Sequence, residues 1–165
     1  MANFLEQLVA EWYEFNGYFI RRNVHVGKRE RGGYECELDV VAFNPEERRL
    51  LHIEPSMDAD SWEKREARFR KKFEAGKKHI PDLFHSFKPL PEIQHIALLA
   101  ATGASSVRHP QLGGGKVVTI ANFLDDIRAD VAKRPILKAA IPEQYVILRT
   151  LQFAAQHWRT ARRAD

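Results

Sequence analysis

Four acidic residues in the first third of the chain could act together in metal or acid–base chemistry. Glu35, Glu37 and Asp39 occupy alternate positions of one expected strand, and Glu54 lies near the end of the next. Because successive side chains of a strand point to opposite faces, we expect the first three carboxylates to share a face of the sheet. Neighbouring carboxylates resist ionising together unless a cation compensates them, and a divalent metal is one such cation. Simple solvation of an exposed strand face is the alternative explanation.

Two consecutive strands are expected to hold these acids. Segment 34–43 alternates apolar and polar residues, and segment 49–55 is an apolar run that places His52 and Glu54 on a common face. If the two strands form a hairpin, Asp39 and Glu54 lie close together. His52 has a suitable unperturbed pKa for a base near Glu54, although a lone histidine on a strand is more often structural.

Composition narrows the class of protein. A chain of 165 residues with 44% hydrophobic content suits one globular domain with a sizeable core. No run approaches the roughly 18 apolar residues that span a membrane, and the first residues lack the pattern of a secretory signal, so we expect a cytoplasmic protein. The single cysteine, Cys36, excludes an internal disulfide and is expected to be a packed thiol.

The positive charge is concentrated in one segment. Residues 62–78 contain eight basic and three acidic side chains, which gives the segment +5 and leaves −1 for the rest of a chain of net charge +4. Apolar residues recur there at helical spacing, which predicts an amphipathic helix with a basic outer surface. A solvated helix face has the same pattern, but such a surface also attracts polyanions. The residues expected to bind nucleic acid are Arg65, Arg68, Lys71 and Lys72.

The periodicity of the whole chain predicts an α/β protein. The expected elements are a helix at 3–16, strands at 18–26, 34–43 and 49–55, the basic helix, strands at 93–100 and 116–120, and helices at 122–132 and 142–162. We expect a mixed sheet of about five strands flanked by helices. The chain should be a single domain over 1–165, with a core at about 1–121 and a C-terminal helical extension at about 122–165.

The element order α-β-β-β-α-β over about residues 1–100 resembles the PD-(D/E)XK, or restriction-endonuclease-like, nuclease superfamily. The Holliday-junction-resolvase-like members are the most similar in style. The motifs that carry the resemblance are Glu6 with Val9-Ala10, Tyr13 and Gly17-Tyr18, then Glu37-Leu38-Asp39, and then Ile53-Glu54-Pro55-Ser56. The resemblance implies a restriction-endonuclease-like αβββαβ core.

The resemblance also implies a site and an activity. Asp39 and Glu54 would bind Mg²⁺ or Mn²⁺, with Glu6 as an outer or third ligand. Glu37 either contributes to a second ion or pairs with Arg21 on the adjacent strand. The implied activity is endonucleolytic hydrolysis of phosphodiester bonds in DNA.

Ser56 stands where the family usually places a lysine. That lysine is thought to orient the attacking water or to stabilise developing charge, and a neutral hydroxyl cannot replace a cation at either task. Members of this superfamily can move the lysine to a neighbouring element. Lys64, the nearest lysine after Glu54, is therefore the expected replacement, with Arg65 as a weaker substitute because its guanidinium is a broad fork.

The substitution at Ser56 leaves more than one function open. The chain is either an active nuclease or a degenerate member of the fold that binds nucleic acid or a protein partner without cleaving. A structural or assembly subunit that uses the basic or the C-terminal helix as its interface is a third reading. A homodimer and a separate specificity subunit both remain open as partners.

Overall fold

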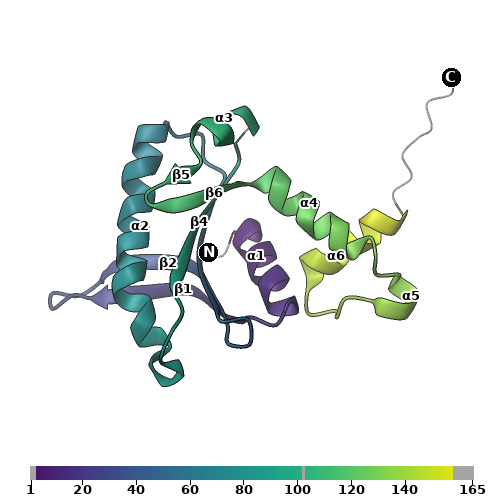
Figure 1. Ribbon diagram of the computed structural model, residues 1–165, viewed down its shortest axis with the longest axis horizontal. Coiled ribbons are helices and arrows are strands. Elements are labelled where there is room, and N and C mark those ends of the chain that lie inside the picture. Colours follow the sequence, from purple (N-terminus) through teal and green to yellow (C-terminus); the bar gives the residue numbers. More distant parts are fainter. Residues whose placement is uncertain (1–2, 102, 158–165) are drawn as a thin grey trace.

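The chain folds into an open sheet with helices on both faces (Figure 1). The computed structural model describes residues 3–101 and 103–157. The helices are α1 (Phe4–Phe15), α2 (Trp62–Leu83), α3 (Gly103–Arg108), α4 (Ile120–Val131), α5 (Ile136–Ala139) and α6 (Val146–His157), with a short 3₁₀ helix η1 (His85–Phe87). The strands are β1 (Phe19–Lys28), β2 (Tyr34–Asn44), β3 (Arg49–Ser56), β4 (Ile93–Leu99), β5 (Gln111–Leu112) and β6 (Gly115–Thr119).

The sheet is mixed and has six strands in the order β1-β2-β3-β4-β6-β5. Strands β1 to β3 pair antiparallel, β4 is parallel to both β3 and β6, and β5 closes the edge antiparallel to β6. A parallel pair needs a crossover connection, and α2 supplies it between β3 and β4. The α/β prediction is confirmed, with a sixth, very short strand beyond the expected number.

Apolar residues fill a layer on each face of the sheet. Leu8 of α1, Leu51 of β3 and Leu148 of α6 belong to the layer that also receives α4. Phe73 and Ile80 of α2 lie in the layers on the opposite face, and all of these side chains are buried. Full burial of one such side chain stabilises the fold by about 1.5–3 kcal/mol, so both helical layers hold the sheet in place.

The two helices nearest the acidic strands begin at polar caps. Asn3 accepts the N–H of Leu5 at 2.9 Å, while Glu6 accepts the N–H of Asn3 at 3.4 Å, which forms a capping box at α1. Ser61 caps α2 by accepting the N–H of Lys64 at 3.4 Å. These caps fix where each helix starts relative to the strands.

The C-terminal helices differ from the expected boundaries. Pro142 was expected in the first turn of the last helix, but α6 begins only at Val146. Gln152 of α6 accepts the N–H of Ile141 at 2.9 Å and donates to the carbonyl of Ala139 at 3.0 Å, which holds the preceding loop in an extended path. The end of the expected helix, beyond residue 157, lies outside the described residues.

No helix within residues 3–101 and 103–157 combines the length and hydropathy needed to cross a bilayer.

Candidate active site

Asp39 of β2 and Glu54 of β3 converge on the side chain of Lys72, which comes from α2. The Nζ atom of Lys72 is 2.6 Å from Asp39 Oδ1 and 2.6 Å from Glu54 Oε2. The antiparallel pairing of Val40 with Ile53 places the two acids at neighbouring positions of adjacent strands. The expectation that a hairpin brings Asp39 close to Glu54 is therefore confirmed.

These three charged groups line a pocket of about 230 Å³. Glu54 is almost completely buried at its floor, with 3% side-chain exposure, whereas Asp39 and Lys72 keep 16% and 23%. The remaining lining residues are Pro55, Ser56, Asp58, Arg68 and Phe69. A small molecule fragment or a phosphate group can therefore reach the charged groups from solvent.

Lys72, not Lys64, is the lysine that the fold brings to the carboxylates. Lys64 lies in the first turn of α2 and is exposed, whereas Lys72 lies eight residues later, about 12 Å further along the helix axis. Lys72 follows the buried Phe69 by three positions and precedes the buried Phe73 by one. Its place on the sheet-facing side of the helix was readable from this spacing, but nearness in sequence to Glu54 favoured Lys64 instead.

A buried histidine pair orients Glu54 from behind. His52 Nε2 lies 2.7 Å from Glu54 Oε1, and His52 Nδ1 lies 3.1 Å from His95 Nδ1. Burial, reinforced by Lys72, lowers the pKa of His52 to about 3, so the ring is neutral. A neutral ring that donates from Nε2 to a carboxylate must accept at Nδ1, which assigns the proton between the rings to His95. His52 is thus a structural partner of Glu54 and not a base.

Glu54 has one oxygen held and one oxygen directed to the pocket. Oε1 accepts from His52 and also from the backbone N–H of Asp39 at 3.2 Å. Oε2 contacts Lys72. The carboxylate therefore presents a single oxygen in a fixed direction.

The absence of a side chain at Gly76 makes room for His52. A Cβ atom at Gly76 would collide with two atoms of the His52 ring. Alanine is usually more favourable than glycine inside a helix by about 1 kcal/mol. We expect Gly76→Ala nevertheless to lower the free energy of unfolding by about 1–3 kcal/mol, because the buried site is overpacked.

Urea denaturation of Gly76→Ala measures this effect. Ala67→Gly, at an exposed position of the same helix, is the control for ordinary helix propensity and should cost about 1 kcal/mol. Stabilisation by Gly76→Ala would contradict the close approach of α2 to His52.

The charges in the pocket are unbalanced. Burial, together with the adjacent Glu54 carboxylate, raises the pKa of Asp39 to about 7, and Lys72 offsets only part of this shift. Burial lowers the pKa of Lys72, but Glu54 and Asp39 more than compensate and raise it above its ordinary value. Two carboxylates share one ammonium group, so a further cation is electrostatically favoured there.

The donor groups of the pocket decide whether it can hold a metal ion. No cluster of three or more His, Cys, Asp and Glu side chains in the described part of the chain is arranged to hold a metal. Asp39 and Glu54 nevertheless direct carboxylate oxygens at one point, marked by Lys72 Nζ. Mg²⁺ is commonly held by one or two carboxylates while it keeps several waters, so this donor set fits that ion.

Arg65 lies inside the molecule, contrary to the expected outward position. It is 7% exposed, and it donates to Asp58 Oδ1 at 3.2 Å and to the Asp58 carbonyl at 2.5 Å. The prediction of an outer surface position is wrong for this residue because Asp58, in the loop before α2, captures its guanidinium. Lys71, in contrast, is exposed as expected.

Arg68 forms the rim of the pocket. It pairs with Asp58 and with Asp60, at 3.0 Å for the latter, and donates to Ser56 Oγ at 3.2 Å. Burial raises the pKa of Asp58, but hydrogen bonds from Ser56 and Arg68 outweigh it and hold that pKa well below its usual range. Ser56 is thus part of a network that fixes the rim.

Glu6 and Glu37 are not brought to Asp39 and Glu54. The Nδ2 atom of Asn23 joins them, at 3.3 Å from Glu6 Oε2 and 3.2 Å from Glu37 Oε1. Glu37 also lies 3.1 Å from His25 Nε2, and its contacts are with these residues and not with Arg21. Glu6, which was expected as an outer ligand, instead caps α1.

The expected common face is wrong for Glu37 and Asp39, because the alternation of β2 changes phase between Leu38 and Val41. Leu38 packs on the same side as Val41, under α2, whereas Val40 packs on the side of α1. Asn23, opposite this point on β1, has a positive φ of 51°. Asp39 therefore contacts α2 while Glu37 is linked through Asn23 to α1.

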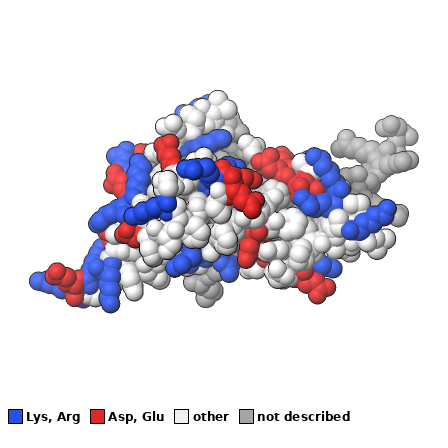
Figure 2. Space-filling model, turned by 60° about the horizontal axis from the view of Figure 1, so that its bottom comes forward, with Lys and Arg blue, Asp and Glu red and all other residues white. Residues whose placement is uncertain are grey.

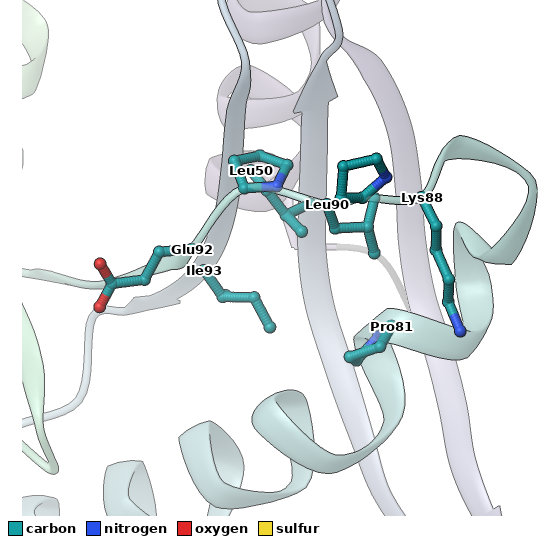
Figure 3. A pocket seen from close by; sticks show the side chains of 8 residues that line it. Leu50, Pro81, Lys88, Leu90, Glu92 and Ile93 are labelled. Carbon is teal, nitrogen blue, oxygen red and sulfur yellow. The ribbon is translucent and has the colours of Figure 1, made fainter.

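A larger hollow lies at the other end of β3. It has a volume of about 680 Å³ and is lined mainly by proline and aliphatic residues, together with Lys88 and Glu92 (Figure 3). Figure 3 shows Glu92 directed away from the other labelled side chains. Glu92 is the one acid among the described residues that line this hollow, so the smaller pocket at Lys72 is the better candidate for chemistry.

The fold and the pocket define an α/β protein in which two strand carboxylates and one helix lysine meet at the edge of a buried layer. Comparison of the sequence with models of known families and with curated proteins finds no match.

Proposed function

We propose that this protein is a metal-dependent nuclease that hydrolyses phosphodiester bonds in DNA on a PD-(D/E)XK-like core. The observation that carries the proposal is the convergence of Asp39, Glu54 and Lys72 in one accessible pocket. The order α1-β1-β2-β3-α2-β4, with two acids on consecutive strands, supports it. The lysine comes from α2 and takes the place of the one that Ser56 cannot provide.

Asp39 and Glu54 would hold Mg²⁺ or Mn²⁺. Glu54 is prepared for this role because His52 and the N–H of Asp39 bind one of its oxygens and leave the other facing the pocket. When bound, the ion supplies a water of lowered pKa and neutralises charge on the phosphate.

Lys72 would stabilise the charge that develops on the phosphate oxygens. Its neighbours raise its pKa, so the amine stays protonated in the pocket. A preorganised cation in a water-poor site stabilises a transition state strongly because it needs little reorganisation when the charge appears. Lys72 must turn from the carboxylates toward the phosphate for this task. Its 23% exposure and flexible side chain permit that movement.

Arg68 would position the substrate at the rim. Its side chain is 40% exposed and lines the same pocket as Lys72. A guanidinium can bind two phosphate oxygens in parallel, so Arg68 suits a phosphate next to the one that is cut.

A DNA-binding protein without cleavage is the second candidate, and one observation favours it. Lys72 Nζ already satisfies both carboxylates and lies where a metal would be bound. If this ion pair persists, the pocket neither takes up a metal nor hydrolyses DNA.

The proposal is tested by measuring metal binding and DNA cleavage in wild type and in Glu54→Gln. We expect wild type to bind Mg²⁺ in calorimetry and to cut one of supercoiled, linear or branched DNA. Loss of one partner in a catalytic constellation should lower cleavage by about 10²-fold or more. Glu74→Gln, at an exposed site on α2, should leave both properties unchanged. A wild-type protein that binds DNA, does not bind metal and does not cleave DNA would favour the second candidate.

A further inference from the structure

The β1–β2 hairpin extends beyond the rest of the sheet. The two strands pair from Phe19 with Phe43 to Lys28 with Tyr34, whereas β3 pairs only with 40–44 of β2. Residues 24–38, here called the hairpin arm, therefore project past β3 and cross α2 (Figure 1). An isolated two-stranded hairpin is marginally stable, so this arm needs support from elsewhere.

The arm contacts α2 through apolar side chains, Val26 and Leu38 against Ala75 and Ile80, and through the carboxylate of Glu35. Glu35 Oε2 lies 3.0 Å from Lys78 Nζ and 3.1 Å from His79 Nε2. Gly27, on the facing strand, has a positive φ of 67°, and a Cβ there would collide with the Glu35 side chain. The arm thus has a defined position against the helix.

The arm and its base carry a cluster of exposed basic side chains. Residues 19–34 hold five basic side chains and one acid, a net charge of +4, while Glu35 and Glu37 further along the arm contact α2 and His25 respectively. The basic residues are Arg21, Arg22, Lys28, Arg29 and Arg31, and all of them are exposed. Within the described ranges, none of the five forms an ion pair.

Five of the eight basic residues of α2 form ion pairs, whereas Lys64, Lys71 and Lys77 form none within the described ranges. Arg65 and Arg68 pair with Asp58, and Lys72 pairs with the two carboxylates of the pocket. Arg70 pairs with Glu66 at 2.7 Å, a contact between neighbouring turns of the helix. Figure 2 shows Lys and Arg side chains gathered toward the end of the molecule where α2 and the arm lie in Figure 1. Among side chains without an ion pair in the described ranges, residues 19–34 keep five cations against Glu30, whereas α2 keeps three lysines against three acids. The net attraction for a polyanion is therefore greater at the arm and its base.

We infer that the hairpin arm holds the phosphate backbone of double-stranded DNA on one side of the pocket, an inference that rests on the proposed function. Strand β2 runs from Asp39 at the pocket to Tyr34 at the end of the arm. At about 3.3 Å per residue, these five steps span about 17 Å. A duplex rises by about 3.4 Å per base pair, so the arm contacts phosphates about five base pairs from the pocket.

The composition of the arm favours a duplex over a single strand. Proteins that bind single strands stack the bases on several aromatic side chains. Residues 24–38 contain one such side chain, Tyr34, and its ring packs 5.0 Å from that of His25. The three cations of the arm outnumber its one stacking side chain, which favours contact with phosphates over contact with bases.

The test compares two triple variants that remove equal charge from different places. The arm variant is Lys28→Gln, Arg29→Gln and Arg31→Gln. The control is Arg128→Gln, Lys133→Gln and Lys138→Gln, which are exposed cations on and between α4 and α5. Affinity for a duplex of about 20 base pairs is measured by fluorescence anisotropy with a chelator present, at about 50–200 mM salt.

We expect the arm variant to weaken duplex binding at least tenfold and the control to weaken it less than threefold. Each phosphate contact adds about 0.9 to the slope of log affinity against log salt, so the arm variant should lose about 2–3 from that slope. Calorimetry of Mg²⁺ binding to the arm variant should give the wild-type affinity, which shows that the pocket remains folded.

The outcomes separate this inference from the proposed nuclease. If the arm variant binds duplex DNA as wild type does while Glu54-dependent cleavage persists, the arm does not hold the duplex, but the proposed nuclease activity is retained. A larger loss of duplex affinity in the triple variant Lys64→Gln, Lys71→Gln and Lys77→Gln would assign duplex binding to α2 instead. Tighter binding of wild type to single-stranded DNA or to an RNA duplex would overturn the choice of partner.

Discussion

Replacing Lys72 by Met is expected to lower the rate of DNA cleavage by about 10²–10³-fold, whereas Lys64→Met should change it less than twofold. The reason is geometric, because only Lys72 brings its ammonium within 2.6 Å of Asp39 and Glu54. Lys64 is exposed at the start of α2. Single-turnover cleavage at saturating metal measures the chemical step directly.

Metal binding by the Lys72→Met variant separates a catalytic lysine from a purely structural one. Removing an ammonium that competes for the same carboxylate oxygens should leave Mg²⁺ affinity equal to wild type or tighter. Circular dichroism must show that the variant is folded, because the substitution leaves two carboxylates without their partner. Cleavage that survives in Lys72→Met but fails in Lys64→Met would overturn the assignment made here.

Asp39→Asn is expected to abolish Mg²⁺ binding while making the metal-free protein more stable at pH 8. The pKa of Asp39 is raised from 3.8 to about 7 in the folded protein. The folded state therefore binds this proton more tightly than the unfolded state does. Its contribution to stability is complete below about pH 4 and is lost as pH rises toward 7.

Asparagine does not carry this penalty. Its carbonyl can still accept from Lys72, as Asp39 Oδ1 does. One pKa unit corresponds to about 1.4 kcal/mol, and we expect a gain of about 1–3 kcal/mol over wild type at pH 8. The gain should shrink as pH falls from 7 to 4.

Urea denaturation in a chelator at several pH values measures this difference. Added Mg²⁺ should then stabilise wild type but not Asp39→Asn, since a ligand stabilises only the state that binds it. Asp82→Asn, at an exposed position of α2, is the control for general charge effects. A variant that is less stable than wild type at pH 8 would show that Lys72 dominates the electrostatics of Asp39.

Periodicity predicted most of the fold because the strands and helices each bury one continuous apolar face. Helix α1 and strands β1 to β3 begin and end close to the expected positions. The approach of Asp39 to Glu54 followed from the same reasoning. The common face of Glu37 and Asp39 did not, because the backbone changes phase opposite Asn23, and a positive φ at one asparagine leaves no mark in an alternating pattern.

The sequence alone also could not show which charged side chains are unpaired in the folded protein. Counting basic residues favoured α2, but the count cannot tell that Arg65 is buried against Asp58. Ion pairs between distant segments, such as Lys72 with Glu54, form only in the folded chain. The hairpin arm has fewer cations than α2, but all three of them, Lys28, Arg29 and Arg31, are exposed and form no ion pair within the described ranges.

Residues on successive turns of helix α2 have several unrelated roles. It provides Lys72 to the pocket, leaves space at Gly76 for His52, and anchors the arm through Lys78 and His79. Segments that pack into several layers exchange their amide protons only when the whole domain opens. The central amides of α2 should accordingly exchange at the rate of global unfolding. Under the proposed function, DNA binding and hydrolysis would then depend on one cooperative unit, so that unfolding of α2 would abolish both together.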